Sequence, residues 1–223
     1  MIRLISLLLL ILLPLTAFAE QNANPGINDH YQNPDVGQWR GVFERDGREV
    51  WDRRDDIIRV LDLQPGMAIA DIGAGTGFFT MLMARELGPM GKAYAVDIAP
   101  EFVKAIELRA KGQGIDNIVG IVNDQKSTRL PPQSVDLVFI SDTYHHFEYP
   151  MTTLKSIHEA LRPGGELVVI DFKRIPGFSS AWVMSHVRAG EDQVTTEIQS
   201  AGFEPVQRLD FMQTQYFLRF RKR

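Results

Sequence analysis

The sequence contains no cysteine. This absence excludes disulfides, thiolate metal sites, cysteine nucleophiles and a lipid attached through an N-terminal cysteine. Histidine and acidic residues do not occur in pairs at metal-ligand spacing, so we expect no metal. An excess of basic charge is also absent, because 24 Lys and Arg face 28 Asp and Glu for a formal net charge of −4. Bulk charge therefore gives no reason to expect a nucleic-acid partner.

A long hydrophobic run is missing as well. The apolar stretch from Leu4 to Leu13 is well short of the roughly 20 residues that a permanent transmembrane helix needs. Arg3 precedes it, Pro14 ends it, and Ala17-Phe18-Ala19 places small residues where a signal peptidase reads. Residues 1–19 are therefore predicted to be a secretory signal cleaved before Glu20. This predicts an exported protein, periplasmic or secreted; an uncleaved signal would instead anchor it to a membrane.

The remaining chain suits one domain with a substantial core. Residues 20–46 are expected to form an arm or linker, because 21–37 is rich in Asn, Asp, Pro and Gly and has no apolar period. A domain over 47–223 should begin with an amphipathic helix that ends before the turn at Gln64-Pro65-Gly66. Strands are then predicted at 68–72, 93–96, 118–122, 135–140, 167–170, 204–211 and 215–220, with helices at 80–87, 100–112, 151–161 and 191–201.

These strands are apolar on both faces and alternate with helices, which is typical of a buried parallel sheet. The fold class is therefore a doubly wound, Rossmann-like α/β domain. The short connection between the last two strands predicts a C-terminal antiparallel hairpin. A turn is expected at Arg162-Pro163-Gly164-Gly165.

A glycine-rich turn follows the first of the strands. It contains Gly73, Gly75 and Gly77, where the backbone can approach a ligand closely at the start of a helix. A nicotinamide-binding turn would require a third glycine where this chain has Phe78. Asp97 ends the next strand about twenty residues further on, where an acid can accept hydrogen bonds from ribose hydroxyls. These residues indicate a nucleoside-type ligand.

At this point the sequence resembles the class I S-adenosylmethionine-dependent methyltransferases, closest to the branch typified by quinone-biosynthesis enzymes. The resemblance runs from about Val60 to the C-terminus. It rests on six segments in order: Asp71-Ile72-Gly73-Ala74-Gly75-Thr76-Gly77, Val96-Asp97, Asn123-Asp124, Ser134-Val135-Asp136-Leu137-Val138, His145-His146-Phe147 and Leu161-Arg162-Pro163-Gly164-Gly165. The resemblance implies a seven-stranded sheet whose last strand is antiparallel, with S-adenosylmethionine as the cofactor.

The resemblance also implies a role for each matching residue. The three glycines would shape the floor under the methionine part, and Asp71 would help to hold its ammonium group directly or through water. Asp97 would bind the ribose, and Asp124 would accept from the adenine amino group with Gln125 beside it. Alternatives from the residues alone remain: Asp71 as a helix N-terminal acid and Asp124 as a turn residue.

The methyl group of a sulfonium is already activated, so much of the catalysis can come from positioning the acceptor. A base is needed only when the acceptor must lose a proton. His145 and His146, which follow the fourth strand with Asp142 and Tyr144, are the candidates. The alternative is that this stretch packs and caps the next helix.

Other residues are weaker candidates. Trp39 and Phe43 could cover the cofactor or simply pack, and His186 and Arg188 could contact an acceptor. We therefore expect methyl transfer to a small or lipid-like acceptor. The alternative is a secreted, non-catalytic protein that keeps the S-adenosylmethionine pocket. A nicotinamide-dependent oxidoreductase is disfavoured by Phe78, and arsenic methylation by the lack of cysteine. The sequence does not indicate an oligomeric state.

Overall fold

A computed structural model describes residues 20–223, so the predicted signal at 1–19 lies outside the described residues. Seven strands form one sheet in the order β3-β2-β1-β4-β5-β7-β6. The strands β1 to β5 pair in parallel, and β7 runs antiparallel to both of its neighbours, β5 and β6. The strands are β1 (Ala68–Ile72), β2 (Lys92–Asp97), β3 (Ile118–Val122), β4 (Val135–Ser141), β5 (Leu161–Phe172), β6 (Phe203–Leu209) and β7 (Gln215–Lys222). The predicted doubly wound sheet with a C-terminal hairpin is confirmed.

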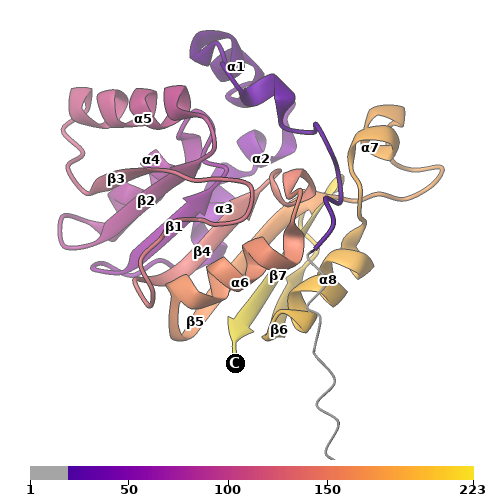
Figure 1. The fold of residues 1–223 in the computed structure, drawn as a ribbon. Helices are drawn as coiled ribbons and strands as arrows, with labels where there is room; N and C mark the ends of the chain where they lie inside the picture. The colour runs from indigo at the N-terminus through magenta and orange to yellow at the C-terminus, as the bar shows by residue number, and fades with distance from the viewer. Residues whose placement is uncertain (1–19) are drawn as a thin grey trace, which may run out of the picture.

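Helices cover both faces of this sheet (Figure 1). The core on one face includes side chains of α3 and α4, and α5 packs beside them; α6 and α8 contribute to the core on the opposite face. The helical segments are η1 (Asp29–Tyr31), α1 (Val36–Phe43), α2 (Glu49–Asp52), α3 (Arg54–Leu61), α4 (Phe78–Leu87), α5 (Pro100–Gly112), η2 (Tyr144–His146), α6 (Pro150–Ala160), α7 (Ala181–His186) and α8 (Glu191–Ser200). All five residues of β1 are buried, as expected for a strand covered on both faces.

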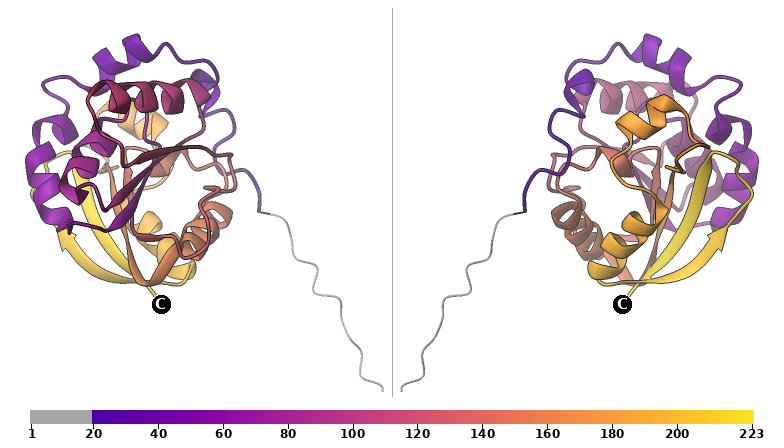
Figure 2. Two further views of the ribbon diagram at one scale, coloured as in Figure 1. Left: turned by 90° about the vertical axis from the view of Figure 1, so that its left-hand side faces the viewer. Right: turned by 90° about the vertical axis from the view of Figure 1, so that its right-hand side faces the viewer.

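The arm folds onto the domain, which corrects the prediction of an extended or disordered linker. It contains η1 and α1, which lie with α7 at the end of the molecule opposite the C-terminus (Figures 1 and 2). Its polar side chains bind partners far along the chain, such as Asn28 with the carbonyl of His146. A composition rich in Asn and Asp predicts no local structure, because it carries no information on contacts with distant residues.

Two smaller expectations also differ from the structure. The helix predicted before Gln64 is divided into α2 and α3, with Arg53 between them. The predicted turn at 162–165 lies within β5, where the register with β4 shifts between Val135 and Leu137. A bulge of this kind inserts residues without ending the strand. Within residues 20–223, every helix is too short or too polar to span a bilayer.

Candidate functional site

A large cavity opens at the carboxyl ends of β1, β2, β4 and β5. Its volume is about 1010 Å³, and its walls include Gly73, Asp97, Asp124, His145 and His186. The strand order reverses between β1 and β4, the switch point at which doubly wound sheets bind ligands. Ligand pockets usually measure about 300–1,000 Å³. The cavity therefore has room for a nucleoside-type cofactor and a second molecule.

The glycine turn forms the floor of this cavity. Gly73, Gly75 and Gly77 have φ values of +72°, +54° and +78°, a region that residues with a side chain rarely adopt. A Cβ on Gly73 would collide with the Thr143 side chain, and one on Gly77 would lie 2.6 Å from Ile106. Gly73 and Gly75 line the cavity. Gly77 instead packs on α5 and allows the turn to sit close to that helix.

Asp97 is buried at the end of β2, where it is fixed by backbone donors. Its Oδ2 accepts from the N–H of Gly75 at 2.7 Å, and its Oδ1 accepts from that of Ala99 at 2.9 Å. Burial raises the pKa of Asp97 to about 6, against the effect of these hydrogen bonds. A carboxylate oxygen can accept more than one hydrogen bond. Asp97 can therefore hold the glycine turn and still accept from a ribose hydroxyl.

Asp71 lies at the end of β1 and is also buried. The Thr80 hydroxyl of α4 donates to its Oδ2 at 2.6 Å. Burial raises the pKa of Asp71 to about 7, and the nearby charge of Asp97 adds to this shift. Two buried carboxylates at neighbouring strand ends favour a cationic ligand, because a positive charge offsets their mutual repulsion.

Asp124 and Gln125 both line the cavity but use their side chains within the protein. Oδ1 of Asp124 accepts from the backbone N–H groups of Lys126 and Ser127, each at 2.9 Å, and Arg129 pairs with Oδ2 at 3.2 Å. Gln125 donates to Glu148 at 2.8 Å. Asp124 thus makes the turn contacts considered as its alternative role, and its contact with an adenine remains a prediction.

His145 forms a buried pair with Asp171 on the opposite wall. Its Nδ1 lies 2.8 Å from Oδ1 of Asp171, and its backbone N–H donates to Oδ2 at 3.0 Å. Burial by itself would lower the pKa of His145, but the Asp171 carboxylate raises it overall. The Nε2 atom of His145 is buried and has no hydrogen-bond partner among the described residues. Such a pairing orients an imidazole for proton transfer or for ligation.

His146 and His186 stand beside His145. One ring nitrogen of each of the three histidines lies within 4.8 Å of the corresponding atoms of the other two. Burial, with the charges of His145 and His186, lowers the pKa of His146 to about 3. The fold thus joins the two predicted base candidates to His186, which the sequence indicated only as an acceptor contact.

The arm closes the cavity with aromatic rings. Tyr31 and Trp39 lie 4.9 Å apart between ring centroids, and Trp39 and Phe43 lie 5.0 Å apart. The Phe43 ring would be 3.2 Å from a Cβ at Gly75. Trp39 and Phe43 therefore both pack together and line the cavity.

A buried carboxylate anchors this cover. Glu44 accepts from Arg109 of α5 at 2.7 Å and from the Thr76 hydroxyl of the glycine turn at 2.9 Å. Arg48 donates to Asp142 at 2.7 Å. The Glu44 contacts link the arm to α5 and to the turn after β1, and the Arg48 contact links the start of the following segment to the residue after β4.

Some candidates are directed away from the cavity. The Tyr144 hydroxyl donates to Glu197 at 2.8 Å, and Arg188 forms an ion pair with the same carboxylate. Sequence reasoning missed Asp171 and Asn28. Asp171 could have been found by the rule that found Asp97, since both follow apolar strand residues. Asn28 carries no comparable signal, because it lies in an irregular segment.

The residues present fit S-adenosylmethionine. The glycine turn lets the backbone of Gly73 and Gly75 line the cavity directly, and Asp71 and Asp97 supply acceptors for an ammonium group and a ribose. Asn123 Oδ1 and Ser141 Oγ belong to residues that line the cavity and are buried without a protein partner among the described residues. Such atoms are expected to find a partner in a ligand or in water.

Comparison with known proteins supports this interpretation. A family model described as a methyltransferase domain matches residues 63–216. A demethylmenaquinone methyltransferase from Geobacillus stearothermophilus is 30% identical over 118 residues, 53% of this chain and 50% of the relative. The ubiquinone/menaquinone biosynthesis C-methyltransferase UbiE from Hydrogenovibrio crunogenus is 28% identical over 127 residues, 56% of this chain and 49% of the relative. The chain thus spans about half the length of the curated relatives it matches.

The fold of a solved structure agrees. The structure of a SAM-dependent methyltransferase from Aquifex aeolicus aligns with a TM-score of 0.75 at 21% identity, covering 85% of this chain and 99% of that chain. The matched family model extends over more than half of the chain and includes β1 to β5. The chain therefore belongs to the S-adenosylmethionine-dependent methyltransferase family with the class I fold.

Proposed function

We propose that this protein transfers a methyl group from S-adenosylmethionine to a small or lipid-like acceptor, with a phenolic or quinol-type ring as the favoured class. One observation carries the proposal. A single cavity has the glycine turn and Asp97 on one wall and the His145–Asp171 pair on the other. The names of the relatives support a quinol-type ring.

The chemistry follows from this arrangement. The bound cofactor supplies an activated methyl group on a sulfonium, and the cavity walls hold the acceptor near it. When the attacking atom of the acceptor carries a proton, Nε2 of His145 takes that proton. The Asp171 carboxylate, 2.8 Å from Nδ1, then stabilises the imidazolium. S-adenosylmethionine would supply the methyl group to the acceptor and would leave as the thioether.

Exposed apolar side chains on α7 and on the loop before it support a lipid-like acceptor. Ile175, Phe178 and Trp182 are 47%, 60% and 53% exposed, and Trp182 also lines the cavity. Large apolar side chains gathered on a surface are typical of sites that bind apolar partners. This rim would hold the apolar tail of an acceptor while its ring enters the cavity.

The first test is calorimetric titration of the protein with S-adenosylmethionine and, separately, with its demethylated product. We expect binding of both, and loss of binding in Asp97→Ala, because the ribose acceptor and the anchor of Gly75 are removed together. Unchanged affinity in Asp97→Ala would refute the placement of the cofactor. His158→Gln, on α6 away from the cavity, is the matched control.

The second test compares two quinol acceptors with the same ring, one with a short isoprenoid tail and one without. In Phe178→Ala we expect KM to rise for the tailed acceptor and to stay constant for the short one, because Phe178 is exposed outside the cavity lining. Met90 is exposed on a distant turn, so Met90→Ala controls for the loss of apolar surface area. Equal KM changes for both acceptors would argue against a lipid-like acceptor.

We further propose that the protein is exported and cleaved before Glu20, on the basis of the N-terminal sequence. Mass spectrometry of the exported protein should find Glu20 at the new N-terminus. Recovery of an intact Met1 in the membrane fraction would favour the anchor instead.

A further inference from the structure

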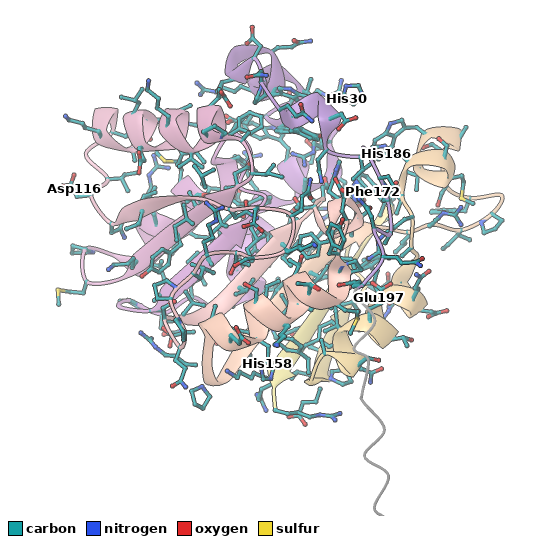
Figure 3. All side chains as sticks on the ribbon, viewed as in Figure 1. His30, Asp116, His158, Phe172, His186 and Glu197 are labelled. Carbon is teal, nitrogen blue, oxygen red and sulfur yellow. The ribbon has the colours of Figure 1, made fainter. Side chains whose placement is uncertain are left out.

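Three histidines from two separate segments meet at the acceptor side of the cavity. His145 and His146 lie on η2, and His186 is the last residue of α7. The ring centroids of His145 and His146 are 4.3 Å apart, and those of His186 lie 5.2 Å and 5.3 Å from them. Figure 3 shows His186 beside Phe172, at the end of β5. The closest nitrogens of the three rings are all within 4.8 Å of one another.

The first ring is held by a buried carboxylate. Because an ionised carboxylate only accepts hydrogen bonds, Nδ1 of His145 must donate to Asp171. Its Nε2 is then the remaining nitrogen. The His145 side chain is only 3% exposed, and Nε2 meets no hydrogen-bond partner among the residues that the structure describes. A buried polar atom of this kind indicates an interaction with something other than the protein.

The second ring is held by an asparagine of the arm. Nδ1 of His146 lies 3.2 Å from Oδ1 of Asn28. The amide orientation is set from the other side, since Nδ2 of Asn28 donates to the His146 carbonyl at 3.0 Å and to Oε1 of Gln125 at 3.1 Å. Oδ1 therefore faces His146 as an acceptor, and Nδ1 must carry the proton. The lone pair of neutral His146 is then on Nε2.

The third ring is held by stacking. Trp182, one turn earlier on α7, lies 4.5 Å from His186 between ring centroids at an interplanar angle of 21°. This contact restrains the imidazole without using either nitrogen. All three rings are thus restrained, and at least one nitrogen of each is free to bind a ligand.

We propose that His145, His146 and His186 bind a divalent transition-metal ion of the zinc class. Three protein ligands and one open position are typical of catalytic zinc sites. Imidazole nitrogens favour zinc, copper, iron and nickel over magnesium or calcium. The Asp171–His145 pair is the carboxylate–histidine arrangement that supports metal ligands, and Asn28 supports His146 in the same way. Zn–N bonds of about 2.0–2.1 Å place the ligand nitrogens closer to one another than 4.8 Å. We therefore expect the three rings to move slightly toward the ion when it binds.

Sequence spacing does not reveal this site, because His186 is distant from the other two histidines along the chain and no acidic residue is at ligand spacing. The expectation of no metal, drawn from sequence spacing, did not take account of ligands that the fold brings together. The binding of the ion does not depend on the proposed function. Its use does: the open position would take the hydroxyl oxygen of an acceptor, and the ion would lower the pKa of that hydroxyl so that its proton passes to bulk water instead of to His145.

The test uses the full chain, stripped with a chelator that is then removed, in the absence of cofactor and acceptor. Titration with Co²⁺ should give one ion per chain and the visible absorption of a tetrahedral site, and Zn²⁺ should displace it. We expect His186→Ala to weaken Zn²⁺ binding by about 100-fold or more, and Asp171→Asn by about 10–100-fold, as supporting residues usually do. His158→Gln, far from His186 (Figure 3), should bind as the unmodified protein does.

A protein that binds no Co²⁺, or a His186→Ala variant with unchanged affinity, would overturn the proposal. If a variant misfolds, ¹⁵N NMR of the unmodified protein provides the test instead. Zn²⁺ should shift one ring nitrogen each of His145, His146 and His186 and leave those of His158 unchanged, and unshifted signals would refute the site. Methyl transfer by the metal-free protein would leave the proposed function intact. Failure of the metal site can therefore be distinguished from failure of the proposed methyl transfer.

Discussion

At the scale of single residues, the buried carboxylates of Asp71 and Asp97 should make cofactor binding dependent on pH. Their pKa values are raised to about 7 and about 6, so both are largely protonated at pH 5. The cofactor carries a sulfonium and an ammonium, which favour the ionised carboxylates. Binding must therefore release protons in this range, and affinity should fall as the pH falls through 7 and 6, by roughly tenfold per pH unit for each proton.

Calorimetric titrations at several pH values, in buffers of different ionisation enthalpy, would measure this proton release. Stability should change in the opposite direction. An acid whose pKa is raised on folding binds its proton more tightly when folded. The ligand-free protein should therefore lose stability as the pH rises from about 4 to 7. Asp71→Asn should remove the change in affinity and the change in stability that occur near pH 7. A pH-independent affinity would contradict the assignment of Asp71 to the cofactor.

The Gly77 position offers a test of the glycine turn. In Gly77→Ala the new Cβ would lie 2.6 Å from Ile106 in a backbone region that costs about 1–2 kcal/mol for other residues. Crowding of a packed core adds about 1–3 kcal/mol. We expect urea unfolding to show a loss of about 2–5 kcal/mol. Gly66→Ala, with φ of +88° and no atom within 4 Å of the added Cβ, should lose only the first part. Equal losses would show that the contact with α5 is unimportant.

At the scale of the elements, α1 is linked to the domain by the buried carboxylate of Glu44 at its C-cap and by the aromatic contacts of Trp39 and Phe43. Glu44 joins it to Arg109 and Thr76. Glu44→Ala should release α1 and withdraw Phe43 from the glycine turn, so that S-adenosylmethionine binds at least about tenfold more weakly, a free-energy change of about 1.4 kcal/mol. Titration calorimetry would measure the change. Arg40→Ala removes an exposed partner of the same carboxylate and should have little effect.

Sequence reasoning worked best where an element is defined by its own residues. The strands at 68–72 and 118–122 and the helix at 100–112 have the predicted bounds. It failed for η1 and α1, because their stability comes from contacts with distant residues. The residues of the cavity walls show the same difference. Asp97 is the last residue of a strand and was predicted, whereas Asn28 acts only through tertiary contacts and was missed.

For the whole molecule, cofactor binding should stabilise the fold and the arm together. A ligand at 100 times its Kd adds about 2.7 kcal/mol to the free energy of unfolding. We therefore expect a higher Tm with S-adenosylmethionine, and slower hydrogen exchange at backbone amides of α1. Asp97→Ala should show neither change. A higher Tm with unchanged exchange in α1 would show that the arm does not take part in binding.

The arm also has a consequence for when the cavity is completed. It is synthesised well before its partners: Asn28 contacts residues up to 120 positions away, and Glu20 binds the start of α6 across 132 positions. Contacts of such long range form late in folding. A chain whose arm has not yet docked is therefore expected to lack the cover of its own cavity. We then expect S-adenosylmethionine to be taken up after folding is complete, rather than carried along by the nascent chain.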